Sequence, residues 1–169
     1  MAVTSAQLRM ARAALNWTVR DLAKAAGLHR NTIINIETGR RQGDSATLAK
    51  IDKVLTRAGI EFLEENGGGP GVRLSGRLQK TPSILTVLIR QVKAARALLG
   101  WSQEDLAAAA GVSVPTVKRL EAGQGVLGGR AETGRKIRTA IEAAGVEFIH
   151  EKDGGPGVRL GKRRRSGRS

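Results

Sequence analysis

The chain contains no cysteine, which excludes disulfide bonds, iron–sulfur clusters, thiolate zinc sites and a cysteine nucleophile. Its two histidines are too few for an ordinary catalytic zinc site without carboxylate ligands. Aromatic residues make up only 2% of the sequence, so the chain lacks the stacking platforms of single-stranded nucleic-acid binders. No apolar run approaches the roughly 18 residues of a membrane span. We therefore expect no cofactor, no metal and no membrane partner.

Basic residues dominate the charged part of the composition. Among 169 residues there are 29 Lys and Arg but 15 Asp and Glu, a formal net charge of +14. Such a surplus favours a polyanionic partner, and the 40% hydrophobic content is sufficient for a packed fold. Residues 1–20 contain Arg but no acid, as in a transit peptide. Because their pattern returns at 91–104, we interpret residues 7–20 as structure and expect a cytoplasmic protein.

An internal repeat organises the sequence. Residues 7–39 match residues 91–123 at 15 of 33 positions, and residues 57–74 match residues 143–160 at 12 of 18. Two copies at this spacing indicate tandem domains rather than a solenoid. We expect a first domain at 4–76, a linker at 77–80, a second domain at 81–160 and a basic disordered tail at 161–169.

Each copy is predicted to be mainly α-helical, with about four to five helices followed by a short β-hairpin. The spacing of Thr18 and Asp21 predicts a capped start of the second helix. Gly27 and Gly39 predict the ends of the second and third helices, since glycine adopts the left-handed conformation common there. Apolar and polar residues then alternate around the Gly-Gly-Gly-Pro-Gly turn at 67–71, which predicts the hairpin. The second copy repeats these signals.

Two short helices joined by a glycine-containing turn form a helix-turn-helix, whose later helix fits the major groove of B-DNA. In the first copy Ile33 and Ile36 provide an apolar side for that helix. Arg30, Asn31 and Asn35 project from the opposite side. Arginine pairs bidentately with guanine and asparagine with adenine, so this face is suited to reading double-stranded DNA.

The sequence also resembles a known family. Trp101-Ser102-Gln103-Glu104-Asp105, followed by Thr116-Val117-Lys118-Arg119-Leu120-Glu121, is similar to the Cro/CI-type (XRE) helix-turn-helix domain, and the first copy is similar to a second member. The resemblance implies a transcriptional regulator that binds double-stranded DNA, and we expect the binding to be sequence-specific. The sequence shows no Ser/His/Asp order, P-loop or metal-ligand spacing, so we do not expect an enzyme. It also implies internal ion pairs, Arg12 with Glu37 and Arg96 with Glu121.

We expect DNA contacts at the start of each second helix, on each third helix and in the basic segments. These residues are Thr18, His29, Arg30, Asn31, Thr32, Asn35, Arg40 and Arg41 in the first copy, Ser102, Gln103, Ser113, Thr116, Lys118 and Arg119 in the second, and Lys162, Arg163, Arg164 and Arg165 in the tail. His29 has an alternative role as a helix-start residue. Arg40 and Arg41 have an alternative role in solubility. Trp17 and Trp101 are interpreted as core residues.

Three residues depart from the family pattern and leave other functions open. Val19 stands where the family has Gln, and Val114 and Pro115 stand where third-helix residues are usually polar. One alternative is therefore a protein-binding regulator, in which one copy serves dimerisation or captures a protein partner. The charge by itself also fits a nonspecific nucleoid-type DNA binder.

The two hairpins suggest how the copies associate. A lone two-stranded hairpin is marginal in water, so we expect hairpins to pair edge to edge and to bury Phe62 and Phe148. Pairing inside one chain gives an intramolecular pseudo-dimer with unlike half-sites, whereas pairing between chains gives a homodimer with a palindromic site. The extra apolar residues at 84–88 fit either arrangement.

The tail generates a prediction of its own. Deletion of residues 161–169 removes five cations, so it should lower affinity equally for preferred and random duplexes. Each lost phosphate contact should reduce the magnitude of the log–log salt slope by about 0.9. Titrations of both duplexes at several salt concentrations measure this. A deletion that weakens only the preferred duplex contradicts the prediction.

Overall fold

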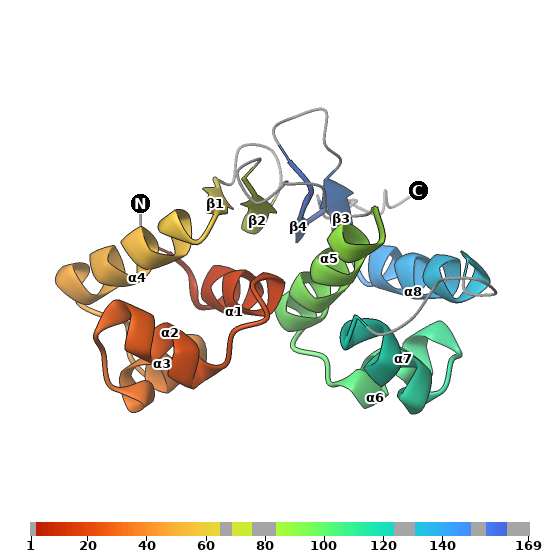
Figure 1. Ribbon diagram of the computed structural model, residues 1–169, viewed down its shortest axis with the longest axis horizontal. Helices are drawn as coiled ribbons and strands as arrows, with labels where there is room; N and C mark the ends of the chain where they lie inside the picture. Colours follow the sequence, from red (N-terminus) through yellow and green to blue (C-terminus); the bar gives the residue numbers. More distant parts are fainter. Residues whose placement is uncertain (1–2, 65–68, 76–83, 124–130, 150–154, 162–169) are drawn as a thin grey trace, which may run out of the picture.

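The computed structural model shows a mainly helical chain in two copies that meet through a small β-sheet (Figure 1). It describes residues 3–64, 69–75, 84–123, 131–149 and 155–161. The first copy comprises α1 (Ser5–Ala14), α2 (Val19–Ala26), α3 (Arg30–Glu37), α4 (Ser45–Arg57), β1 (Ile60–Leu63) and β2 (Gly71–Leu74). The second comprises α5 (Ile84–Leu99), α6 (Gln103–Ala110), α7 (Val114–Glu121), α8 (Ala131–Ala143), β3 (Val146–Ile149) and β4 (Gly157–Leu160).

The predicted fold class is confirmed, and the described ranges contain four helices per copy, within the four to five expected. The linker at 77–80 and the tail residues Lys162, Arg163, Arg164 and Arg165 lie outside the described residues, as do the side chains of residues 84–88.

Local capping sets the helix boundaries as the sequence predicted. Thr18 and Asp21 form a reciprocal capping box, in which the Thr18 hydroxyl accepts from the Asp21 amide and the Asp21 carboxylate accepts from the Thr18 amide. Gly27 ends α2 in the left-handed conformation, at φ 62°. The second copy repeats both devices, with Ser102 and Asp105 in the capping box. The turn between the second and third helices is therefore fixed by local chemistry in each copy.

A buried glutamine joins the first helix of each copy to its hairpin. Gln7 is 6% exposed, and its side-chain amide donates to the carbonyls of Leu63 (3.0 Å) and Gly71 (3.2 Å). Gln91 does the same for Ile149 and Gly157. These bonds satisfy carbonyls at the turn ends of both hairpins. Each hairpin is thereby attached to the helical part of its own copy.

The two hairpins form one four-stranded antiparallel sheet in the order β1-β2-β4-β3. Val72 pairs with Val158, its own counterpart in the repeat, and the flanking pairs are Gly71 with Arg159 and Arg73 with Gly157. This register maps onto itself when the copies are exchanged. The sheet therefore pairs the copies within one chain about a pseudo-two-fold axis, which is one of the two arrangements expected from the sequence.

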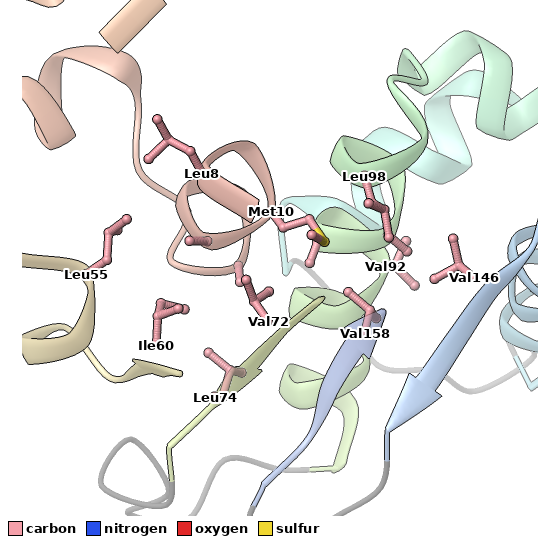
Figure 2. Close-up of a cluster of buried hydrophobic side chains, with 14 of the residues drawn as sticks. Leu8, Met10, Leu55, Ile60, Val72, Leu74, Val92, Leu98, Val146 and Val158 are labelled. Carbon is pink, nitrogen blue, oxygen red and sulfur yellow. The ribbon is translucent and has the colours of Figure 1, made fainter. Parts of the chain in front are cut away.

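The first helices of the copies, α1 and α5, pack against each other over this sheet. Met10 extends from α1 toward α5, where Val92 and Leu98 lie (Figure 2). Met10 is fully buried, and its counterpart Ala94 is 2% exposed. The matching position thus holds a long side chain in one copy and a small one in the other. The two halves of this interface are therefore not identical.

The expectation for the two phenylalanines is only half right. Phe148 is 7% exposed, but Phe62 is only partly buried. The Arg138 guanidinium lies over the Phe148 ring, 5.6 Å from its centroid. The matching position in α4 is Asp52, whose short acidic side chain cannot cover the ring of Phe62 in this way.

Two glycines permit the close approach of β2 and β4. A Cβ atom at Gly71 would lie 2.7 Å from the Val158 carbonyl oxygen, and one at Gly157 would lie 2.8 Å from the Arg73 Cα. Both distances are too short for carbon, and backbone atoms cannot move aside cheaply.

Gly157→Ala should therefore push β2 and β4 apart and destabilise the protein by about 1–3 kcal/mol. The matched control is Gly134→Ala in α8, where a Cβ meets open space and should stabilise the helix by up to about 1 kcal/mol. Thermal unfolding and amide exchange of β2 measure both effects. Unchanged β2 protection in Gly157→Ala would contradict the pairing.

Candidate nucleic-acid interface

Each copy carries a helix-turn-helix unit, formed by α2 and α3 in the first and by α6 and α7 in the second. Both units lie along the edge of the molecule that is opposite the sheet (Figure 1). The hairpin pairing and the contact of α1 with α5 hold the units beside each other. The chain thus presents two helix-turn-helix units on one side.

Helix α3 is clearly two-sided. Ile33 and Ile36 are 0% and 4% exposed and pack into the core. Arg30 and Asn31 are exposed on the outer side, and Asn35 is half-buried with them. Of the other expected contact residues in this copy, Thr18, His29, Arg40 and Arg41 are exposed and Thr32 is half-buried.

His29 serves as the N-cap of α3. Its Nδ1 atom accepts a hydrogen bond from the Asn31 amide at 3.2 Å. This supports the alternative role considered for His29, since one ring nitrogen is engaged by the helix end. The ring remains exposed at the edge of the unit. The capped start of α3 fixes the direction in which Arg30 and Asn31 leave the helix.

A buried ion pair joins α3 to the first helix. Arg12 Nε and Nη2 bond the two Glu37 carboxylate oxygens at 2.7 and 3.0 Å, and Nη1 donates to the Trp17 carbonyl at 3.0 Å. The Glu37 side chain is 8% exposed and that of Arg12 is 23% exposed. One guanidinium therefore ties together α1, the loop before α2, and the end of α3. Trp17 is partly buried against the core.

The second copy contains the same device. Arg96 bonds the Glu121 carboxylate at 2.7 and 3.0 Å and the Trp101 carbonyl at 2.9 Å. Here the side-chain amide of Gln103 also donates to Glu121, at 2.8 Å. Gln103, expected to face phosphate, is thus engaged inside the protein. Val19 occupies the matching place in the first copy and makes no such bond.

The outer side of α7 presents two cations, where that of α3 presents an arginine and two asparagines. Lys118 and Arg119 are exposed, opposite the buried Val117. The Ser113 hydroxyl lies 2.7 Å from that of Thr116 and also accepts from the Thr116 amide. These two expected contact residues therefore cap the helix. Ser102 likewise caps α6 and remains exposed.

A cleft of about 520 Å³ lies between the two copies. Its walls include Arg12, Arg96 and Lys118. Lys93 also lines it and donates from Nζ to the Asn16 side-chain oxygen of the other copy at 2.6 Å. Partial burial in this cleft lowers the pKa of Lys93. The contact of Lys93 with the other copy was not expected from the sequence, because nothing in the repeat shows which residues face the other copy.

These features define a tandem helix-turn-helix protein. A family model described as "Helix-turn-helix" matches residues 8–59 and 92–129. The chain belongs to this family, and both matches are of the Cro/CI (XRE) type, which consists of DNA-binding regulators. No curated protein and no solved structure matches the chain. Within the described ranges, no helix combines the length and apolar character needed to cross a bilayer.

The Arg12–Glu37 pair generates a stability prediction. Glu37→Ala leaves a largely buried guanidinium without its partner and should cost about 3 kcal/mol. Glu142→Ala removes a carboxylate from an exposed pair with Arg138 and should cost less than about 1 kcal/mol. Denaturant unfolding of both variants tests the difference. Similar losses of stability in the two variants would show that the buried pair stabilises the protein no more than the exposed pair does.

Proposed function

We propose that the chain is a sequence-specific transcriptional regulator that binds double-stranded DNA, with α3 and α7 entering the major groove. The observation that carries this proposal is the placement of both helix-turn-helix units on one edge of a single paired body. Two reading helices held side by side can address two half-sites on one face of a duplex. The surplus of positive charge adds attraction to the phosphate backbone.

Phosphate contacts position the protein, whereas base contacts select the sequence. Arg40 and Arg41 follow α3 and are exposed, so they are suited to contact the phosphate backbone of DNA on either side of the groove. The first turn of α2 presents amide groups near Thr18, which favour a phosphate. Arg30 and Asn31 are then directed at base edges. Their side chains match the major-groove edges of guanine and adenine.

Two other functions make different predictions. A nonspecific nucleoid-type binder needs only the charge, and its affinity would be the same for all duplexes. A protein-binding regulator would use the outer face of one copy for a partner and would bind duplex DNA through the other. We favour the DNA regulator because family membership and the two-sided α3 both support it.

The residues on the outer side of α3 provide the main test. Arg30→Ala, Asn31→Ala and Asn35→Ala should each cost about 1–3 kcal/mol on the preferred duplex and relax one base position. Affinity for random duplex should change much less. Preferred sites are first selected from a random duplex library, and fluorescence titration then gives the affinities.

Arg57→Ala is the matched control. Arg57 is exposed at the end of α4 beside the sheet, away from the edge that carries the helix-turn-helix units (Figure 1). The Arg57→Ala change removes one positive charge, as Arg30→Ala does, and should leave the preference for the selected duplex intact. If all three α3 variants keep the full preference of the native chain, α3 does not read bases.

A further inference from the structure

The two helix-turn-helix units differ sharply in charge. Residues 17–41 contain five basic and two acidic residues, whereas residues 101–125 contain two basic and three acidic residues. The first unit therefore carries a net charge of +3 and the second −1. Because phosphate attraction dominates DNA affinity, two units with these charges cannot contribute equally.

The difference falls on the positions that would touch DNA. Three matched pairs lose a basic or amide group in the second unit, namely Arg20 with Glu104, Arg30 with Val114 and Asn31 with Pro115, whereas Ile34 and Asn35 are matched by Lys118 and Arg119. Glu104 is exposed at the start of α6, where its carboxylate repels a phosphate. Neither valine nor proline can make the bidentate hydrogen bonds that distinguish purines. The first turn of α7 therefore lacks the groups that read bases in α3.

Some of the polar groups that remain in the second unit already form hydrogen bonds with other groups of the protein. The Gln103 amide is bound to Glu121, and the Thr116 hydroxyl is bonded to Ser113. Lys118 and Arg119 are left as exposed cations on α7. Both cations can contact phosphate in any sequence, and only Arg119 has the planar guanidinium that is best suited to bidentate pairing with guanine.

The end of α3 has two contacts to α1 that have no counterpart in the second copy. The Ser5 hydroxyl donates to the Ile36 carbonyl at 2.6 Å, and Arg9 donates to the Glu37 carbonyl. The matching residues of the second copy are Ile89, which has no hydroxyl, and Lys93, whose ammonium is bonded to Asn16. These backbone contacts restrict the orientation of α3, which favours base recognition.

We propose that one chain binds an asymmetric duplex site, in which α3 reads the bases of one half and α7 mainly contacts the backbone of the other. This inference rests on the proposed function, and it assigns base reading to the first copy and mainly backbone contact to the second. The intramolecular sheet is what makes the asymmetry possible, since it joins two unlike units. A homodimer of identical units would instead require a symmetric site.

The direct test uses the native chain and three duplexes. The first is the preferred duplex, and in each of the others one half-site is scrambled. Scrambling the α3 half should lower affinity by at least about 30-fold, because several mismatched base pairs each weaken binding roughly fivefold or more. Scrambling the α7 half should lower it less than about 5-fold. Asn31→Ala assigns the halves, since it removes discrimination only in the half that α3 reads.

A gain-of-function variant supplies a second test. Grafting the first unit's residues onto the second, as Glu104→Arg, Val114→Arg, Pro115→Asn and Arg119→Asn together, should shift preference toward a duplex with two inverted α3 half-sites. Glu142→Arg adds the same charge on α8 as Glu104→Arg does and is the control. It should raise affinity for all duplexes without changing the preference.

The outcomes test the asymmetric site separately from the proposed function. Equal losses from the two scrambled duplexes would overturn the asymmetric site and leave sequence-specific binding intact. Equal affinity for all duplexes would overturn the proposed function and the asymmetric site with it. Mass measurement of the complex should find one chain on the minimal site, and two chains there would also overturn the inference.

Discussion

Close backbone pairing of β2 with β4 is the constraint on which the rest of the structure depends. It requires the absence of side chains at Gly71 and Gly157, because a Cβ at either place would meet backbone atoms of the facing strand. The pairing sets the register at Val72 and Val158, and the register sets the pseudo-two-fold relation between the copies. The relative placement of the helix-turn-helix units follows from it.

A series of specific contacts links the sheet to the edge of the molecule that carries the helix-turn-helix units. Gln7 bonds the hairpin to the first helix, and Arg12 bonds that helix to Glu37 at the end of α3. The second copy repeats the chain through Gln91 and Arg96. These buried polar groups are all partnered, so each one fixes an orientation without leaving an unsatisfied group in the core.

The capping and polar contacts inside the two copies are equivalent, whereas the outer positions of the helix-turn-helix units are not. The capping boxes, the ion pairs and the hairpin contacts recur almost atom for atom. The outer positions have diverged in charge and in hydrogen-bonding capacity, as Arg20 and Glu104 show. The scaffold constrains its residues through packing, whereas solvent-facing positions are constrained only by what they bind.

The sequence by itself determined the elements, because their signals are local: capping spacings at Thr18 and Ser102, glycines at helix ends, and alternation in the strands. It also indicated the ion pairs, through the family resemblance. Which hairpin edges meet, that Gln7 closes its hairpin, and that Lys93 reaches Asn16 were decided by the tertiary structure. These contacts join residues far apart in the chain, and no local pattern encodes which distant surface a side chain will face.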